Sequence, residues 1–432
     1  MCVRPWDSYR RCGSQQDTHM PHLNVFDGTK HPGDSPVESG SAEDVLRHVE
    51  RVGAVVQGIY VHVPFCVHRC HYCDFFTIAG RDEYRGRYVD RVLSEAAAAV
   101  PRLRQGIETI FIGGGTPTHL PPRDLSRLLL GLRTLLAAGG HSLKEWTIEA
   151  NPDTITPQLA AILAESGVTR VSLGAQSFDL DSLRVLQRHH QPSNVGRAME
   201  FLRDAGIEDL SLDLIFGIPG QAAPLDIWDG DLDAAIALSP THLSCYGLTY
   251  EAGTPLRRRL DVGDITSVCE DIEARLYEQA MDRLAAAGFE QYEISNWARP
   301  GYQCRHNLGY WRNANWWPLG PSGSGHVDAR RWRNVPRLGP WLEGKGLSPI
   351  DSFEQLDLDG RFGEILMLGL RLNEGVPSKQ VEEAVLTPDR GPGRKDAIDR
   401  YLAAGLLVWQ ADRLILSSRG RLLADTVIGD LL

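Results

Sequence analysis

The segment Val63–Phe75, VPFCVHRCHYCDF, is the most informative part of the sequence. It follows an apolar run, Gly58–Val63, which predicts a buried strand. Its three cysteines, Cys66, Cys70 and Cys73, have the spacing C-x3-C-x2-C. Three thiolates spaced in this way can bind three irons of a [4Fe–4S] cluster and leave the fourth iron without a protein ligand. Because an open coordination position is typical of catalytic metal sites, we expect the chemistry of the protein to lie directly after this strand.

A structural zinc site is the alternative for this segment, with the three cysteines and one of His62, His68 or His71 as ligands. Zinc sites usually pair their ligands as C-x2-C and take a second pair from a distant segment. No second C-x2-C pair occurs in the sequence, so we favour the iron–sulfur cluster. The remaining cysteines are scattered, as expected of buried or incidental thiols without a role: Cys2, Cys12, Cys245, Cys269 and Cys304.

From Ile59 onward, short apolar segments alternate with amphipathic ones. This alternation predicts parallel strands joined by right-handed crossover helices. We expect strands near Gly58–Val63, Thr109–Ile112, Trp146–Glu149, Arg170–Leu173, Leu210–Ile215 and His242–Leu248. We expect helices at Asp82–Val100, Pro122–Ala138, Pro157–Ser166, Val195–Ala205 and Leu225–Leu238. The predicted fold class is α/β, an open, partial (β/α)6 barrel of the TIM type with its chemistry at the C-terminal ends of the strands.

The chain has 432 residues and is acidic, with 45 Lys and Arg against 56 Asp and Glu and a net charge of −11. An acidic surface repels phosphate backbones, so nucleic acid is not an expected partner. The first twenty residues lack the apolar run of a signal peptide. The most apolar stretch, Leu128–Leu136, is interrupted by Arg133 and is too short to span a membrane. We therefore expect a cytoplasmic protein without a transmembrane segment.

Composition and periodicity divide the chain into four expected parts. Residues 1–55 are rich in polar residues, Gly and Pro and predict a flexible tail with one short helix at 42–49. The barrel is expected at 56–290, and an aromatic-rich segment at 291–345. Residues 346–432 predict helices at 362–372 and 397–402, then a hairpin at 406–416 and a final helix, which together suggest a winged-helix-like C-terminal domain. With this acidity we favour a structural or partner-docking role for that domain over DNA binding.

Polar residues and glycines occupy the expected C-terminal ends of several strands. Residues 111–118 read FIGGGTPT, and three successive glycines let a backbone approach a ligand closely. Glu149, Gln176 and Asp213 follow three other strands and should point to the same rim. A carboxylate at that rim can accept hydrogen bonds from ribose hydroxyls, although capping of a neighbouring helix is an alternative role for each residue.

Four linked motifs resemble the radical S-adenosylmethionine (SAM) family that includes oxygen-independent coproporphyrinogen III dehydrogenase and the HemW-type heme chaperones. They are YVHVPFC at 60–66, the cysteine triad, GGGTPT at 113–118 and DLIFGIPG at 213–220. The resemblance runs from about Gly58 to the C-terminus and implies a partial TIM barrel and a [4Fe–4S] cluster that binds SAM through its open iron. It also implies that Tyr72 packs beside the cluster and that SAM pockets are lined by Tyr60, Gly114, Gly115, Thr116, Glu149, Gln176, Arg188 and Asp213.

Within that family, the sequence is similar to the chaperone branch. The dehydrogenase pattern requires a fourth cysteine two residues after the third, where this chain has Phe75. Residues 292–301, YEISNWARPG, and 306–311, HNLGYW, resemble segments of the chaperones, and the second is their proposed heme-binding motif. The resemblance implies heme contacts from His306, Asn307, Tyr310 and Trp311. Physically, His306 can offer an axial imidazole, and the two aromatic rings can offer flat apolar faces.

The residues alone leave an alternative for this motif, an aromatic cluster that packs the open side of the barrel around a hydrogen-bonded histidine. One departure from the chaperone pattern also occurs, because Ser324 stands at the usual position of a histidine and His326 follows two residues later.

We expect a heme chaperone that binds heme and delivers it to an apo-hemoprotein, which could be membrane-associated, with SAM and the cluster supporting transfer. The alternative is a radical SAM enzyme that cleaves SAM reductively and abstracts hydrogen from a tetrapyrrole propionate. A third hypothesis is a winged-helix interaction protein with a vestigial cluster.

Overall fold

The computed structural model describes residues 40–432, so most of the expected N-terminal tail lies outside the described residues. Within that expected tail, helix α1 (Ala42–Val52) is present where a short helix was expected. It begins at a capping box, in which the Ser41 hydroxyl accepts from the Asp44 backbone N–H and the Asp44 carboxylate accepts from the Ser41 N–H. The apolar side of α1, with Val45, Leu46 and Val49, is buried in the core.

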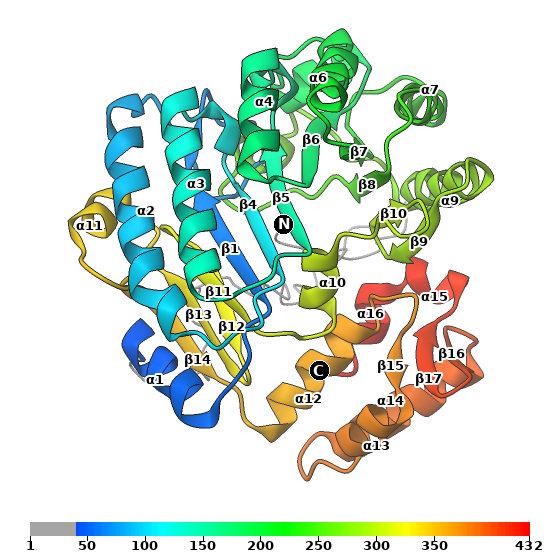
Figure 1. The fold of residues 1–432 in the computed structure, drawn as a ribbon. Helices are drawn as coiled ribbons and strands as arrows, with labels where there is room; N and C mark the ends of the chain where they lie inside the picture. The colour runs from blue at the N-terminus through cyan, green and yellow to red at the C-terminus, as the bar shows by residue number, and fades with distance from the viewer. Residues whose placement is uncertain (1–39) are drawn as a thin grey trace.

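A twelve-stranded sheet is the scaffold of the molecule, and six of its strands follow one another in chain order (Figure 1). These six are parallel neighbours: β1 (Gly58–Val63), β4 (Thr109–Gly114), β5 (Glu145–Ala150), β6 (Arg170–Gln176), β7 (Asp209–Phe216) and β8 (His242–Gly247). The predicted partial (β/α)6 barrel is therefore confirmed, because each expected strand is present and pairs with its successor.

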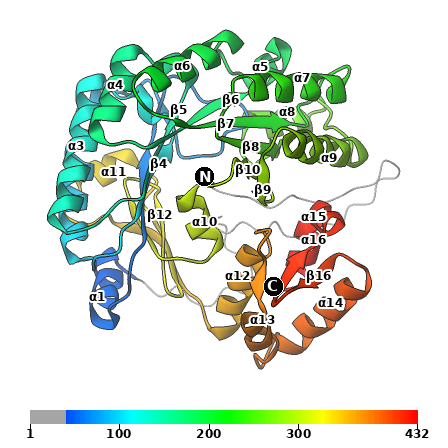
Figure 2. The ribbon, with the colours of Figure 1, turned by 45° about the vertical axis from the view of Figure 1, so that its right-hand side comes forward.

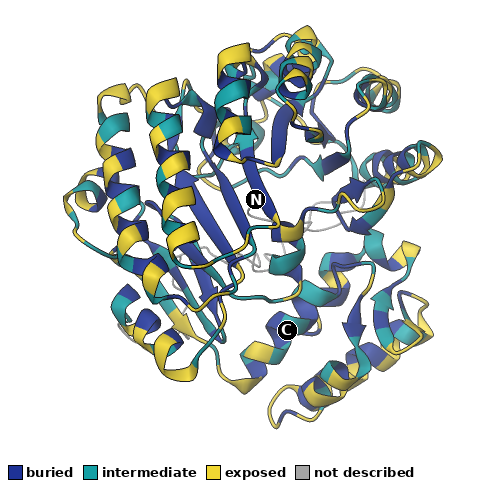
Figure 3. Ribbon diagram, in the orientation of Figure 1, coloured by how far each residue is buried: buried dark blue, intermediate teal, exposed yellow. Residues whose placement is uncertain are grey.

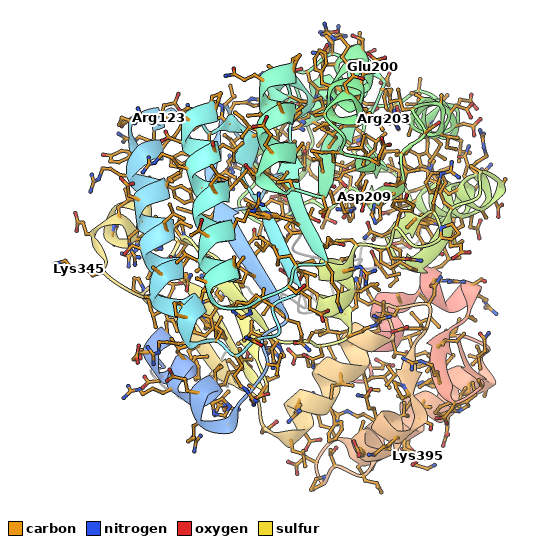
Figure 4. All side chains as sticks on the ribbon, viewed as in Figure 1. Arg123, Glu200, Arg203, Asp209, Lys345 and Lys395 are labelled. Atoms are coloured by element: carbon orange, nitrogen blue, oxygen red, sulfur yellow. The ribbon has the colours of Figure 1, made fainter. Side chains whose placement is uncertain are left out.

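Helices connect these strands and cover the outer face of the curved sheet (Figures 1 and 2). Between successive strands lie α2 (Arg85–Ala99), α3 (Pro122–Ala138), α4 (Pro157–Ser166), α5 (Leu180–Leu186), α6 (Pro192–Asp204) and α7 (Pro224–Ala237), whereas α8 (Pro255–Asp261) and α9 (Glu270–Ala286) follow the last of the six strands. Figure 3 shows buried strands behind helices whose outer sides are exposed. Figure 4 shows charged side chains such as Arg123 and Glu200 on these outer helices. The helices therefore separate the sheet from solvent on that side.

The strands alternate between two kinds of side chain. Residues such as Ile59, Val61, Ile110 and Ile112 pack into the main apolar core. The alternate residues point to the opposite side of the sheet, into the barrel, and most of them are polar: Thr109, Glu145, Thr147, Glu149, Arg170, Ser172, Ser211, Asp213, His242 and Ser244. The interior of the barrel is thus a polar space enclosed by an apolar wall.

Residues 290–355, which include the aromatic-rich segment, add further strands to both edges of the sheet, and the sequence did not predict these strands. At one edge, β11 (Trp316–Leu319) pairs parallel with β1, and an antiparallel run continues through β12 (Ser324–Val327), β13 (Arg330–Asn334) and β14 (Ile350–Gln355). At the other edge lie β10 (Asn296–Ala298) and β9 (Glu290–Glu293). These strands are short, and several of them are rich in Trp or Arg, so the alternation of apolar and polar residues is obscured in the sequence. Helices α10 (Arg305–Trp311) and α11 (Leu338–Glu343) belong to the same segment.

The C-terminal unit has the order of a winged helix and forms a separate lobe (Figure 2). It comprises α12 (Leu358–Gly369), β15 (Val376–Pro377), α13 (Ser378–Val385), α14 (Gly391–Ala403), β16 (Leu407–Gln410), β17 (Arg413–Leu416), α15 (Ser418–Leu422) and α16 (Ala424–Gly429). The three strands form a small antiparallel sheet in the order β15, β17, β16. The winged-helix-like fold is confirmed, and α13 and β15 are the elements of this unit that the sequence did not predict.

Among the helices of residues 40–432, none is both long and apolar enough to cross a bilayer.

The buried side of α1 leads to a prediction about stability. Replacing the fully buried Leu46 with Ala should lower the free energy of unfolding by about 2–5 kcal/mol, because the lost methyl groups leave a cavity. The control is Val52→Ala at the exposed end of the same helix, with an expected change within about 0.5 kcal/mol. Urea titration measures both, and equal stabilities of the two variants would show that α1 is not packed into the core.

Candidate functional site

The cysteine loop, residues 64–79, follows β1 directly, and its first and last residues lie side by side. Within the loop, β2 (Phe65–Cys66) pairs parallel with β3 (Ile78–Ala79). Cys70 is buried and the other two cysteines of the triad are half-buried, and all three are free thiols. Burial raises the pKa of the Cys73 thiol to about 12, and the nearby charges of Cys70 and Cys66 add to this shift. The three sulfurs therefore lie within electrostatic reach of one another.

Cys70 differs from its neighbours because two basic groups contact it. Burial opposes ionisation, yet the pKa of the thiol is lowered, because the His68 imidazole and the Arg188 guanidinium lie against the sulfur. His68 Nε2 is 3.8 Å from Cys70 Sγ, and Arg188 Nη1 donates to the same sulfur at 3.7 Å. These two contacts favour the thiolate, the form that binds metal, at Cys70, whereas burial raises the pKa of the Cys66 and Cys73 thiols.

The glycine loop after β4 holds the cysteine loop by its backbone. The Gly115 N–H donates to the Val63 carbonyl at 2.7 Å, and the Thr116 N–H donates to the Phe65 carbonyl at 2.8 Å. A Cβ on Gly115 would lie 2.8 Å from the Phe65 carbonyl oxygen, so a larger residue would force the loops apart. The Thr116 hydroxyl is 3.5 Å from Cys66 Sγ. The glycine loop was expected to let a ligand approach its backbone. The absence of a side chain at Gly115 also lets the backbone of the cysteine loop lie close.

The two predicted carboxylates, Glu149 and Asp213, lie inside the barrel, and the charge of Asp213 acts on Glu149. Glu149 Oε2 accepts from the Gly114 N–H at 3.1 Å, and both carboxylate oxygens of Asp213 accept from the Ser172 hydroxyl, at 3.1 and 3.2 Å. Burial raises the pKa of each carboxyl, and the charge of Asp213 raises that of Glu149 further. Two carboxyls in this state can accept hydrogen bonds from a polar ligand.

The end of β6 is irregular where the other polar candidates lie. Gln176 has a φ of +66°, a left-handed conformation that is uncommon outside glycine, and the pairing of β6 with β7 shifts register between Gly174 and Gln176. Arg188 follows α5 and donates through Nη2 to the Gly174 carbonyl at 2.7 Å. Arg188 thereby ties this strand end to the cysteine loop. Backbone strain of this kind concentrates at functional sites.

The two predicted tyrosines lie on different sides of the site. Tyr72 packs beside Cys70, against an apolar cluster that includes Leu186 and Ile215. Tyr60 lies deeper in the barrel, where its ring stacks on Phe111 with a centroid distance of 6.3 Å and its hydroxyl is 3.0 Å from His62 Nδ1. The structure thus gathers the predicted SAM residues around the C-terminal ends of the strands, and their contact with SAM stays a prediction.

The donor chemistry of the loop fits a cluster. Each of its three thiols would bind a different iron. His62 is a poor fourth ligand for zinc, because its Nε2 is also engaged, at 2.8 Å from the Phe76 carbonyl oxygen. Within residues 40–432, no three or more His, Cys, Asp or Glu side chains are grouped closely enough to hold a single metal ion.

The candidate heme motif lies on α10, at the opposite end of the barrel. His306 is 3% exposed, and its Nδ1 is 2.8 Å from the hydroxyl of Thr109, the first residue of β4. Its Nε2 is 2.9 Å from the Tyr310 hydroxyl, and its ring stacks on Phe111 at 5.4 Å. Burial lowers the pKa of His306 to about 3. The motif is therefore not next to the cysteine loop, and both imidazole nitrogens are occupied by protein groups.

The other residues of the motif also pack inward. Asn307 donates to the Tyr292 hydroxyl at 3.3 Å. Trp311 is buried beneath the Arg371 guanidinium, whose central carbon is 4.9 Å from the ring centroid. Tyr310 makes an edge contact with Trp316 at 4.5 Å. In this conformation α10 has the packing of the aromatic cluster that was the alternative interpretation of the motif.

Two buried charged residues near α10 were not singled out in the sequence. The Glu145 carboxylate accepts from the backbone N–H of Arg305 at 2.6 Å and of His306 at 3.1 Å, so it caps α10. Arg170 is 1% exposed, and its Nε is 3.8 Å from the carboxylate of Asp209, which begins β7 (Figure 4). Glu145 and Arg170 are each the charged first residue of a strand, a signal that could have identified them.

Ser324 and His326, where the sequence departs from the chaperone pattern, both contact other parts of the protein. Ser324 begins β12, and its carbonyl accepts from Trp316 Nε1 at 2.8 Å. His326 is buried against Trp316, with its Nδ1 3.2 Å from the Ala314 carbonyl oxygen and its Nε2 3.3 Å from Glu364 Oε2. His326 is therefore part of the contact between the sheet and the C-terminal unit.

Residues 60–223 match the radical SAM superfamily, and residues 356–423 match the HemN C-terminal domain. Heme chaperone HemW from Mycobacterium tuberculosis is 38% identical over 386 residues, covering 87% of this chain and 94% of the relative. The Escherichia coli HemW is 34% identical over 377 residues, covering 86% and 96%. A solved structure of E. coli coproporphyrinogen III oxidase (HemN), described as a radical SAM enzyme, has a TM-score of 0.77 and 20% identity, covering 91% of this chain and 94% of that one. At that identity the likeness shows the fold alone.

The loop geometry predicts which cysteines hold a cluster. Alanine at Cys66, Cys70 or Cys73 should remove one thiolate and leave at most a labile, incomplete cluster after anaerobic reconstitution. Cys245→Ala, a buried cysteine of β8, is the matched control and should keep wild-type iron and acid-labile sulfide. Wild-type iron content in all three triad variants would contradict the assignment.

The buried His306 predicts a pH dependence of stability. The folded protein keeps this imidazole neutral down to a pKa of about 3, whereas the unfolded chain protonates it near 6.5. The contribution of the neutral His306 to the free energy of unfolding is therefore complete above pH 6.5, and it is lost as the pH falls from 6.5 towards 3. His306→Gln, which cannot titrate, should reduce the loss of unfolding free energy between pH 7.5 and 5 by about 2 kcal/mol. Denaturant titrations at several pH values measure this, and equal losses in both proteins would refute it.

Proposed function

This chain belongs to the HemW-type heme chaperones of the radical SAM superfamily, and from that premise we propose that it binds heme and delivers it to an apo-hemoprotein. The observation that carries the proposal is the identity to relatives described as heme chaperones, which extends over both the barrel and the C-terminal unit. Phe75, in place of the fourth cysteine of the dehydrogenase pattern, supports the same branch.

We assign the [4Fe–4S] cluster to the thiolates of Cys66, Cys70 and Cys73, with its open iron available to the amino and carboxylate groups of SAM. The glycine loop would present backbone groups to SAM, and Glu149 and Asp213 would accept hydrogen bonds from its ribose. This assignment is supported by the convergence of these groups at one end of the barrel. Arg188, which contacts both Cys70 and the end of β6, would fix the position of the loop.

We assign heme to the motif on α10, with His306 as the axial ligand and Asn307, Tyr310 and Trp311 as further contacts. Iron ligation requires that the imidazole exchange one of its two hydrogen bonds, to Thr109 or to Tyr310, for the metal. Heme binding is therefore coupled to a rearrangement of α10. Such coupling suits a carrier, because a ligand held by a conformational change can be released when that change reverses.

The acceptor in this proposal is an apo-hemoprotein in the cytoplasm or on a membrane surface. The net charge of −11 supports a protein partner over nucleic acid.

The proposal is tested by heme titration of the reconstituted protein. We expect uptake of about one heme per chain, and His306→Gln should shift the Soret band and weaken binding by roughly tenfold or more through the loss of the axial imidazole. His189→Gln, which replaces an exposed histidine, is the control and should keep the wild-type spectrum. An unchanged spectrum and affinity in His306→Gln would place heme elsewhere.

A further inference from the structure

Three consecutive residues at the C-terminal end of α10 are each held by a different residue of the C-terminal unit. The Trp311 ring is covered by the guanidinium of Arg371. Arg312 donates to both carboxylate oxygens of Glu374, at 2.8 and 3.0 Å. The Asn313 amide donates to Glu364 at 3.2 Å. Each of these three residues therefore contacts the C-terminal unit.

Two of these partners have further ionic contacts, one to the large sheet and one within the C-terminal unit. Glu364 lies on α12 and is also bound by Arg331 of β13, at 3.2 Å, and by His326. Arg371, which directly follows α12, faces Asp425 of α16 at 3.9 Å. Figures 1 and 2 both show α12 beside α10. The C-terminal unit therefore contacts α10 through Arg371, which its own fold positions, and through Glu364, which the edge of the large sheet also holds.

The opposite end of α10 is held by the barrel, through Glu145 at the helix N-terminus and Thr109 at the His306 ring. The helix is thus fixed at both ends, and His306, which is 3% exposed and has its Nε2 bonded to Tyr310 of the same helix, is closed to a ligand in this arrangement. The barrel contacts include buried hydrogen bonds to the strands, whereas the contact between Arg312 and Glu374 is exposed and easily broken. Release should therefore begin at the C-terminal end of the helix.

We propose that the C-terminal unit is a latch on α10, and that heme capture and release at His306 depend on opening it. This inference rests on the proposed function and gives the winged-helix-like unit a role within it. The latch consists of Arg371, Glu374 and Glu364 on the C-terminal unit and of Trp311, Arg312 and Asn313 on α10. An acceptor protein that binds the C-terminal unit could open the latch and receive the heme.

The test uses the full, reconstituted chain and two latch variants. Arg312→Gln changes an exposed residue and leaves the core intact, and the double variant Glu364→Gln, Glu374→Gln weakens the latch from the other side. Asp351→Asn is the matched control. It removes a carboxylate from a salt bridge with Arg333, which joins β13 and β14 and does not involve α10. Hydrogen exchange of the amides at 305–313 reports on the latch without heme, and stopped-flow mixing with hemin reports on capture.

We expect both the exchange rate of α10 and the rate of heme association to rise roughly threefold in Arg312→Gln and roughly tenfold in the double variant, with no change in the control. Unchanged exchange in Arg312→Gln and in the double variant would overturn the latch. Faster exchange with unchanged heme association, in a protein that does bind heme, would overturn its role in capture. Failure of the wild type to take up heme would instead overturn the proposed function, and with it the role of the latch in heme transfer.

Discussion

The alternation of side chains along the parallel strands is the constraint on which the rest of the structure depends. Helices cover the outer face of β1 and β4 to β8, so every second residue must be apolar. The residues between them face a space that the partial barrel encloses, and they are free to be polar. This single constraint produces both the apolar wall and the polar interior in which Glu149, Arg170 and Asp213 lie.

The same alternation gives the barrel two chemically different ends. At the C-terminal ends of the strands, backbone hydrogen bonds from Gly115 and Thr116 fix the cysteine loop above the carboxylates. At the opposite end, charged or polar first residues of strands, Thr109 and Glu145, bind α10 instead. Because His306 belongs to this second end, the proposed heme motif and the proposed cluster are separate sites on one scaffold. Any influence of SAM on heme transfer must therefore travel through the strands or through a change in their interior contacts.

Local signals explain why much of this could be predicted from the sequence. Helix α4 was predicted with both of its ends, because Thr156 caps its N-terminus before Pro157 and Gly167 ends it in a left-handed conformation. The strand-end residues were predicted to gather because parallel strands place their C-terminal ends at one rim. The strands β11 to β14 could not be predicted from local signals, because β11 pairs with β1, which lies in a distant part of the sequence. The burial of His306 was anticipated only by the aromatic-cluster alternative, and its partners on β4 and β5 could not be predicted because they come together with it only in the folded chain.

The strength of the contacts on α10 bears on whether the helix can act as a carrier element. An exposed pair such as Arg312 and Glu374 contributes about 0–1 kcal/mol, a buried cation on an aromatic ring contributes about 2 kcal/mol, and a hydrogen bond to a carboxylate contributes about 1.5–3 kcal/mol. The latch is therefore worth a few kcal/mol, which keeps the open form at a small fraction of the population. A ligand or partner that prefers the open form by a similar amount can shift this balance, since a differential affinity of ~5.5 kcal/mol inverts even a 99:1 equilibrium. Several moderate contacts thus suit reversible capture better than one strong contact, which would hold α10 closed against both heme and its acceptor.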